Sequence, residues 1–203
     1  MAMASIIRLA TPDDATHIQA IYAPNVLHTA ISFEQDPPSV EDMRQRIRKT
    51  VPRWPWLVCV FQEEIVGYVY AGEHRSRPAY QWSVDVSVYV QARAHRRGVG
   101  RALYSSLFAL LTLQGFHHAY AGITLPNPGS VGLHESLGFR PIGVYRGVGY
   151  KLGAWHDVGW WGLTLRSSQA APEPLRDLDI LRDTPDWETA LAAGLPFLRL
   201  TSH

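Results

Sequence analysis

The chain has 203 residues, of which 46% are hydrophobic and 18% charged, a composition that fits one compact domain of ordinary size, with room for a tail. Its formal net charge of +1 gives no global bias toward nucleic acid or an anionic membrane. The longest apolar runs fall far short of the roughly 20 residues that a membrane-spanning helix needs, residues 1–5 lack the pattern of a signal peptide, and the single Cys59 allows no internal disulfide. We therefore expect a cytoplasmic protein that binds neither nucleic acid nor membrane.

The first half of the chain predicts a strand, two helices and a three-strand meander. Residues 6–10 alternate like a short edge strand, and Thr11-Pro12 then starts a helix in which Pro24 marks a break or kink. Ser39, with Asp42 three residues later, starts a second helix that runs to about residue 50. The strands of the meander are expected at residues 56–61, 65–71 and 80–90, with a turn at Glu63-Glu64 between the first two.

The second half alternates helices with strands. The expected elements are a helix at 102–114 closed by Gly115, a strand at 118–124, a short helix at 127–137 closed by Gly138, and strands at 139–145 and 155–166. This order predicts an α/β fold in which helices cover the faces of a mixed sheet.

A linker rich in Ser, Gln, Ala and Pro begins at Ser167. We therefore expect one domain over residues 1–166 and a linker and tail over residues 167–203, with helices near 175–181 and 187–193. The tail either docks back through Leu181, Trp187 or Phe197 or forms a mobile, partner-binding arm.

A glycine-rich turn, Arg96-Arg97-Gly98-Val99-Gly100-Arg101, separates the meander from the next helix. Such a turn exposes the unpaired N–H groups of the helix N-terminus, where the helix dipole and nearby arginines favour a phosphate. The Rossmann fingerprint does not fit, because Leu103 stands where its third glycine belongs, and no Gly-Lys-Ser/Thr tripeptide of a Walker loop exists. An ordinary turn with solvated arginines is the alternative.

The chain also does not match the sequence motifs of zinc metalloproteases or of nucleophilic serine enzymes. His134-Glu135 begins like the helix of a zinc metalloprotease, but Gly138 stands where the second histidine must be. The pair His117-His118 has no further ligand at a helpful spacing, so we expect no metal. The run Gly129-Ser130-Val131-Gly132 is not a nucleophile elbow, and Cys59 lies in a strand of buried character.

Several motifs in their order along the chain resemble the GNAT superfamily of acetyl-CoA-dependent N-acetyltransferases. The motifs are Val88-Tyr89-Val90, then Gly98-Val99-Gly100, a helix, a strand, Asn127, and the run at residues 133–139. Within the superfamily, the phosphinothricin and methionine sulfoximine acetyltransferases are the most similar, in segments at residues 27–33, 55–58, 67–72, 75–80 and 149–159. The resemblance covers roughly residues 6–166 and implies a central mixed sheet with a splayed strand pair and helices on both faces.

The resemblance also implies where acetyl-CoA binds. In the superfamily, backbone N–H groups of the splayed strand pair with the pantetheine arm and polarise the thioester carbonyl, while the pyrophosphate sits on the glycine turn. His95 stands where the superfamily usually has Gln or Arg. The implied cofactor contacts are Val88, Tyr89, Val90, Arg96, Arg97, Gly98, Val99, Gly100, Arg101, Asn127, Ser130 and Ser136.

Two candidate catalytic residues follow from the resemblance. An amine attacks a thioester only as the free base, so a proton acceptor is needed. The similar enzymes have a Glu base where this chain has Asp85, which is one methylene shorter and makes a water relay more natural. His134 stands where many GNAT enzymes place a Tyr that protonates the thiolate, and it acts as base or acid. The alternatives are a structural carboxylate and a packed histidine.

The resemblance implies acetyl transfer to the α-amino group of a small amino acid such as phosphinothricin or methionine sulfoximine. We expect direct attack in a ternary complex rather than an acyl-enzyme, because Cys59 lies away from the motifs and no other nucleophile stands out. An anionic acceptor needs cationic donors in a pocket with apolar walls, and the candidates are Phe33, Arg75, Arg77, Ala79 and Tyr80. A homodimer is also implied, with Trp160-Trp161 as a candidate interface, although either tryptophan fits the core equally well.

Two rival functions stay open. One is an acetyltransferase for another amine, such as a polyamine or a protein N-terminus. The other is a CoA-binding regulatory or interaction module in which Asp85 in place of Glu has disabled the chemistry and the tail recruits a partner.

Overall fold

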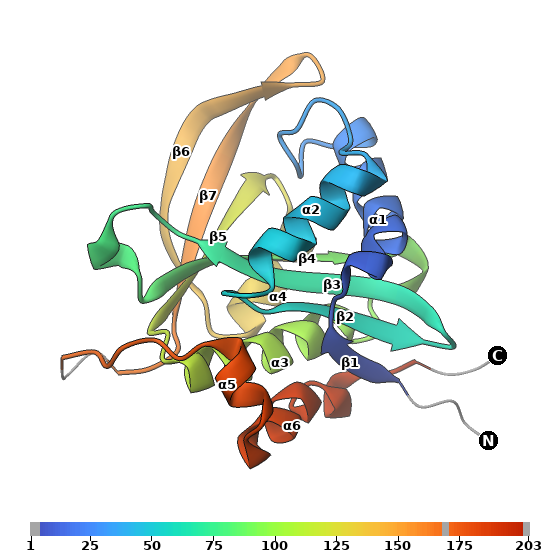
Figure 1. The fold of residues 1–203 in the computed structure, drawn as a ribbon. Coiled ribbons are helices and arrows are strands. Elements are labelled where there is room, and N and C mark those ends of the chain that lie inside the picture. The colour runs from blue at the N-terminus through green and yellow to red at the C-terminus, as the bar shows by residue number, and fades with distance from the viewer. Residues whose placement is uncertain (1–4, 168–170, 201–203) are drawn as a thin grey trace.

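A computed structural model describes residues 5–167 and 171–200 (Figure 1). Within them, one seven-stranded sheet has the order β1-β2-β3-β4-β5-β7-β6, and only the β4–β5 pair is parallel. The expected mixed sheet and α/β class are confirmed. The strands are β1 (Ile6–Leu9), β2 (Trp56–Phe61), β3 (Glu64–Glu73), β4 (Ser83–Val90), β5 (His118–Leu125), β6 (Arg140–Lys151) and β7 (Ala154–Thr164).

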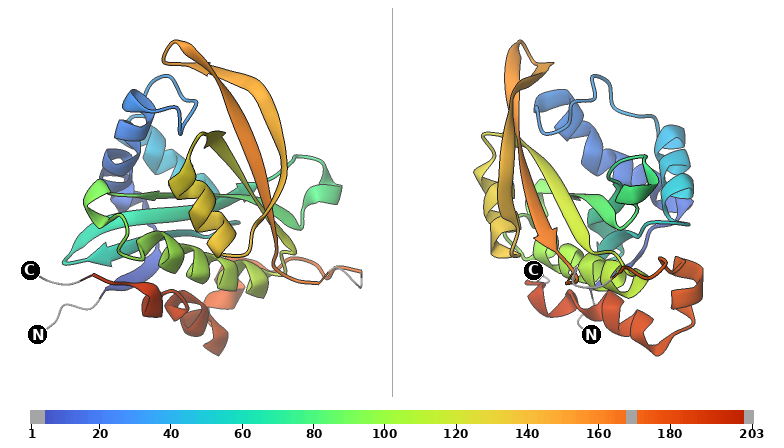
Figure 2. Two further views of the ribbon diagram at one scale, coloured as in Figure 1. Left: turned by 180° about the vertical axis from the view of Figure 1, so that it is seen from behind. Right: turned by 90° about the vertical axis from the view of Figure 1, so that its left-hand side faces the viewer.

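Helices cover both faces of this sheet (Figure 2). The longer ones are α1 (Ala15–His28), α2 (Val40–Thr50), α3 (Val99–Gln114), α4 (Pro128–Ser136), α5 (Leu178–Arg182) and α6 (Pro185–Ala192), and the 3₁₀ turns are η1 (Pro12–Asp14), η2 (Pro78–Tyr80), η3 (Ala92–Ala94) and η4 (Leu195–Phe197). None of these helices is long and apolar enough to cross a membrane.

The alternation of strand β2 explains the two hydrophobic cores. Successive side chains of a strand point to opposite faces, so Trp56 and Val58 pack with α1 and α2, whereas Leu57 and Cys59 pack with α3. The meander is therefore buried on both sides, which fits its nearly continuous apolar sequence.

The N-terminal helices confirm one expectation and correct another. Ser39 caps α2: its Oγ accepts from the backbone N of Asp42 at 3.1 Å, and the Asp42 carboxylate accepts from the backbone N of Ser39 at 3.1 Å. Of the predicted break or kink at Pro24, the break was wrong, because α1 continues to His28. The buried Ile21 and Val26 anchor the helix on both sides of the proline, and this packing compensates for the one hydrogen bond that a proline removes.

Three strand boundaries also differ from those predicted. Strand β4 starts at Ser83 because residues 78–80 form η2, and the β2–β3 turn lies at Gln62-Glu63, whose φ angles are both positive. Strand β6 continues to Lys151, well past the expected end. With β7 it forms a long hairpin that rises from the body of the molecule beside the loop between α1 and α2 (Figure 2).

The C-terminal tail docks against α3 rather than forming a free arm. Leu178, Leu181, Trp187 and Ala190 are all buried and belong to the same core as α3, and α5 and α6 lie below that helix (Figure 1). Of the expected linker, residues 168–170 lie outside the described residues.

Strands β4 and β5 separate partway along their length. They pair only at Ser83 with His118, Val84 with Ala119 and Asp85 with Tyr120, yet each strand continues, to Val90 and Leu125. The resemblance implied such a splayed pair. Beyond Asp85 the facing backbone groups of both strands are therefore available to a ligand.

Candidate active site

A cleft of about 870 Å³ opens where β4 and β5 separate. Strand β4 contributes Val88, Tyr89 and Val90 to its lining, and the glycine turn with the start of α3 contributes Arg96, Gly98, Val99, Gly100 and Arg101. On the facing side, Asn127 and Ser130 line the cleft from the start of α4. Ten of the twelve residues predicted to hold the cofactor are thus brought together.

The glycine turn ends in a helix N-terminus that faces this cleft. Gly98 caps α3 in the left-handed region, with φ +81°, a conformation that glycine adopts without strain. The first-turn N–H groups that follow have no partner within the helix. His95 fixes the turn to the neighbouring strand, because its Nε2 donates to the carbonyl of Val90 at 3.0 Å. The turn thus presents backbone donors to an anion.

The charge of the cleft is one-sided. Among the described residues, its lining contains Arg96, Arg101, Arg199 and His95 and no carboxylate side chain. Arginine side chains combined with helix N–H groups favour phosphate groups. The residues present therefore fit a polyanionic ligand.

Two predicted cofactor residues lie outside the lining. Arg97 faces the tail, and its carbonyl accepts from the backbone N of Arg199 at 2.9 Å. Ser136, at the far end of α4, donates from Oγ to the carbonyl of Leu133 at 2.7 Å. Its own carbonyl accepts from Arg101 Nη2 at 3.1 Å. Arg97 and Ser136 therefore lie outside the lining, but each bonds to a residue that belongs to it.

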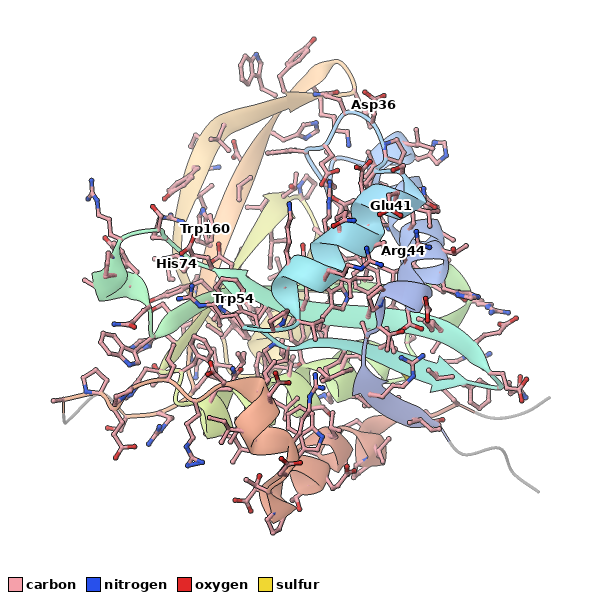
Figure 3. The ribbon with its side chains drawn as sticks, viewed as in Figure 1. Asp36, Glu41, Arg44, Trp54, His74 and Trp160 are labelled. Atoms are coloured by element: carbon pink, nitrogen blue, oxygen red, sulfur yellow. The ribbon has the colours of Figure 1, made fainter. Side chains whose placement is uncertain are left out.

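Asp85 is the last paired residue of β4 and lies at the apex of the splay. Its Oδ1 is 2.6 Å from Nδ1 of His74. The His74 ring stacks on Tyr120 with ring centroids 4.4 Å apart. It also lies edge-on to Trp160, and Figure 3 labels His74 and Trp160 in the same part of the molecule. Burial raises the pKa of Asp85, although His74 and Arg75 act in the opposite direction. The carboxyl still keeps 36% of its side-chain surface exposed, so a proton can reach it.

The sequence analysis missed His74, although the sheet register could have found it. Gly72 of β3 pairs with Asp85 of β4, and residues two apart on a strand share a face. His74 therefore extends β3 on the same side as Asp85.

His134 does not face the cleft. It is buried, with Nδ1 2.8 Å from the carbonyl of Ser130 and Nε2 2.9 Å from the hydroxyl of Tyr104. A carbonyl only accepts, so Nδ1 carries the proton and Nε2 accepts from Tyr104. Burial lowers the pKa of His134. Both ring nitrogens are therefore bonded inside the protein, an arrangement that fits the alternative of a packed histidine.

The predicted acceptor residues divide into two groups. Arg75, Arg77 and Tyr80 line a second cavity of about 250 Å³. Arg75 donates to the carbonyl of His74 at 2.7 Å and lies 5.8 Å from the ring of Trp160. The lining of the second cavity thus includes Glu73 and Arg75, the chain neighbours of His74, but neither His74 nor Asp85.

Phe33 and Ala79 are not among the residues that line either cavity. Phe33 packs on the β6–β7 hairpin, where a Cβ built on Gly149 would collide with its ring. The buried Lys151 supports this contact by donating to the carbonyl of Ser32 at 2.6 Å.

Metal and thiol chemistry find no support in the described part of the chain. Residues 5–167 and 171–200 contain no group of three His, Cys, Asp or Glu side chains that could hold a metal ion. Cys59 is buried in β2, and burial raises the pKa of its thiol to about 12. A thiolate nucleophile at this position is therefore disfavoured.

Comparison with known sequences gives a consistent answer. A profile described as an acetyltransferase (GNAT) domain matches residues 7–160. A phosphinothricin N-acetyltransferase of Streptomyces viridochromogenes is 37% identical over 170 residues, which cover 84% of this chain and 92% of that protein. A methionine sulfoximine/methionine sulfone acetyltransferase of Pseudomonas aeruginosa is 32% identical and is covered completely, again over 84% of this chain.

Comparison with solved structures agrees. The crystal structure of a phosphinothricin acetyltransferase from Sinorhizobium meliloti, in complex with acetyl-CoA, superimposes with a TM-score of 0.80 at 32% identity. The match covers 84% of this chain and 94% of that one.

Proposed function

Because this chain belongs to the acetyltransferase (GNAT) family, we propose that it moves the acetyl group of acetyl-CoA to the α-amino group of a small amino acid such as phosphinothricin or methionine sulfoximine. The enzyme is an acetyl-CoA-dependent amino-acid N-acetyltransferase. The observation that carries the proposal is the splay of β4 from β5, with Asp85 at its apex and a basic cleft beyond it. The cytoplasmic location expected from the sequence belongs to the same proposal.

The lining of the cleft suits acetyl-CoA, the acetyl donor. Acetyl-CoA supplies the reactive thioester. Its polar linear arm suits the backbone groups of β4 that point away from β3, at alternate residues such as Val88. Its diphosphate suits the N–H groups at the start of α3 together with Arg96 and Arg101. Backbone donors at the end of β4 then polarise the thioester carbonyl, which carries the negative charge that develops during attack.

The His74–Asp85 pair supplies the group that removes the proton from the acceptor's ammonium group. Asp85 accepts the ammonium proton of the acceptor, directly or through water, and so supplies the free amine. Its shorter side chain is compensated by His74, whose ring extends the hydrogen-bonded path beyond the carboxylate. We therefore assign Asp85 as the base and His74 as its positioning partner.

Direct attack in a ternary complex follows from what the lining offers. The one thiol of the chain, Cys59, is buried and has a raised pKa, so no acyl-enzyme on sulfur is expected. His134 is the second candidate for proton transfer, to the leaving thiolate. Because its proton is on Nδ1, this role requires its bond to the carbonyl of Ser130 to open.

The second cavity favours an anionic acceptor over a polyamine. Its lining contains Arg53, Arg75 and Arg77 against the single carboxylate of Glu73. A carboxylate and a phosphinate or sulfoximine oxygen would each find a cationic donor there. A polyamine would meet like charges instead.

The decisive test is acetyl-CoA-dependent thiol release over a panel of phosphinothricin, methionine sulfoximine, methionine sulfone, common amino acids and spermidine. We expect turnover confined to the glutamate-like compounds, and a loss of kcat of roughly 10²- to 10⁴-fold in Asp85→Asn. Arg75→Ala should raise the KM of the acceptor more than that of acetyl-CoA. Tight acetyl-CoA binding without turnover of any amine would instead establish the binding-module alternative.

A homodimer is part of the proposal, with β6 as its interface. Strand β6 is an edge strand and exposes Ile142, Val144, Tyr145, Val148 and Tyr150, each by at least 39%. A long apolar edge strand is normally covered. The tryptophans suggested earlier fit less well, since Trp161 is buried in the core and its Nε1 donates to Glu135 at 3.3 Å.

A further inference from the structure

The C-terminal segment, residues 194–200, forms one wall of the cleft in which we place acetyl-CoA. Pro196, Phe197 and Arg199 are among the lining residues. They come from the tail, whereas the family profile ends at residue 160. Nothing in the family match assigns these residues a role.

Three contacts fix this segment in place. Gly194 donates its backbone N–H to Ser106 Oγ at 3.1 Å, and the same hydroxyl donates to the carbonyl of Leu191 at 2.6 Å. The backbone N of Arg199 donates to the carbonyl of Arg97 at 2.9 Å. Since Ser106 is fully buried, its two bonds are shielded from water, and they anchor the start of the segment on α3.

Two glycines allow the close approach. A Cβ built on Gly194 would collide with the carbonyl of Ala102 in α3, and one built on Gly98 would collide with the carbonyl of Phe197. Glycine is thus required at position 98 for two reasons: its φ is left-handed, and a side chain there would collide with the tail. The pyrophosphate turn and the C-terminal segment are packed as one unit.

The side chains of the segment are suited to a nucleotide. Phe197 is 39% exposed, and the guanidinium of Arg101 lies 5.4 Å from its ring centroid. Arg101 also bonds the end of α4, so an apolar ring and a cation lie together at the rim. Arg199 is exposed and adds a further positive charge there.

We propose that Phe197 and Arg199 bind the nucleotide end of acetyl-CoA, with Arg199 recognising the ribose 3′-phosphate. The inference rests on the proposed function, because it places acetyl-CoA in this cleft. With the diphosphate on the N-terminus of α3, the 3′-phosphate needs a separate cation. Among the described lining residues, Arg199 is the arginine that comes from outside the glycine turn and α3. The adenosine packs against the ring of Phe197.

The test compares two donors, acetyl-CoA and 3′-dephospho-acetyl-CoA, in Arg199→Gln. Losing a charge-assisted contact should raise the KM of acetyl-CoA about tenfold, with kcat and the KM of the acceptor unchanged. The KM of the dephospho donor should be the same in the variant and the wild type. Arg182→Gln, also in the tail but absent from the cleft lining, is the matched control and should change neither.

A second variant separates the ring from the charge. Phe197→Ala keeps the backbone carbonyl that packs on Gly98 and should weaken both donors by the same factor. Equal weakening of both donors by Arg199→Gln, or no change of the acetyl-CoA KM, would overturn the inference. If the wild-type protein binds neither donor, the proposed function fails as well, so the two failures are distinguishable.

Discussion

Asp85 and His74 form the smallest unit on which the proposed chemistry depends. Asp85 was predicted from the sequence as a catalytic residue, whereas His74, 2.6 Å away, was not. A local pattern can indicate a carboxylate at the end of a motif. The pairing of β3 with β4 decides which side chain meets it, and that is a property of the sheet.

His74 should set the acid side of the pH profile. Its hydrogen bond and charge lower the pKa of Asp85 against the effect of burial, so His74→Ala should raise that pKa. Because the base must be deprotonated, the rate should then begin to fall at a higher pH as the solution is acidified.

The measurement is kcat/KM against pH for the best acceptor, with His74→Gln as the control that keeps a hydrogen-bond donor. The control should restore most of the wild-type profile. A lower plateau with an unmoved acid limb would show that His74 has only a structural role.

His134 should make stability depend on pH. Burial lowers its pKa in the folded protein, whereas the unfolded chain has an ordinary pKa of about 6.5. Between these two values the unfolded state binds more protons, so the free energy of unfolding should decrease as the pH falls below about 6.5.

The check is the Tm of the wild type and of His134→Leu between pH 8 and pH 5. The variant should lose roughly 1–3 kcal/mol of the free energy of unfolding at pH 8, since Tyr104 loses its acceptor, and the difference should narrow on acidification. The pKa of His118 is also lowered, but its effect cancels in the comparison. A constant difference would contradict the assignment.

At the scale of helices and strands, features set by a few neighbouring residues could be predicted from the sequence, whereas features set by tertiary contacts could not. The capping box at Ser39 and the C-terminal Gly115 were predictable because they act within a few residues. The continuation of α1 through Pro24 was not predictable, since it depends on buried side chains on both sides of the proline. The course of the tail was also beyond local patterns, because it depends on whether Gly98 and Gly194 leave room.

Gly194→Ala tests this packing directly. The residue has φ −85°, so alanine introduces no backbone strain and only the collision with α3 remains. We expect a loss of roughly 1–3 kcal/mol in the free energy of unfolding and a higher KM for acetyl-CoA.

Gly132→Ala is the matched control, because a Cβ at that exposed position of α4 meets nothing within 4 Å. It should stabilise the protein by up to about 1 kcal/mol. Equal effects of the two substitutions in urea unfolding would argue against a tight fit of the tail.

At the scale of the whole molecule, the α/β class followed from the order of elements, and the glycine turn predicted the phosphate site that we place in the large cleft. The dimer stays a prediction: the sequence singled out two tryptophans as its interface, whereas the exposed side chains of β6 favour that strand. Alternation places a residue on a face, but the face that another copy covers is decided by the complete fold.

Val148→Lys should convert the proposed dimer to a monomer, since a charge in the centre of an apolar interface costs several kcal/mol. Light scattering after size exclusion measures the mass. Ile180→Lys is the control, as Ile180 is 64% exposed on α5, and it should leave the mass unchanged. A monomeric wild type, or a dimer that persists in Val148→Lys, would contradict the assignment of β6.

The splay of β4 from β5 also gives this sheet two edges in its interior. Beyond Asp85 and Tyr120 neither strand has the other as a partner, so amide protons that point into the gap are open to solvent, while those bonded to β3 are not. Hydrogen exchange should therefore be fast at alternate residues of 86–90 in the free protein and slow markedly with acetyl-CoA. The ligand would then complete the sheet as a missing strand does, and equal exchange rates with and without acetyl-CoA would speak against that description.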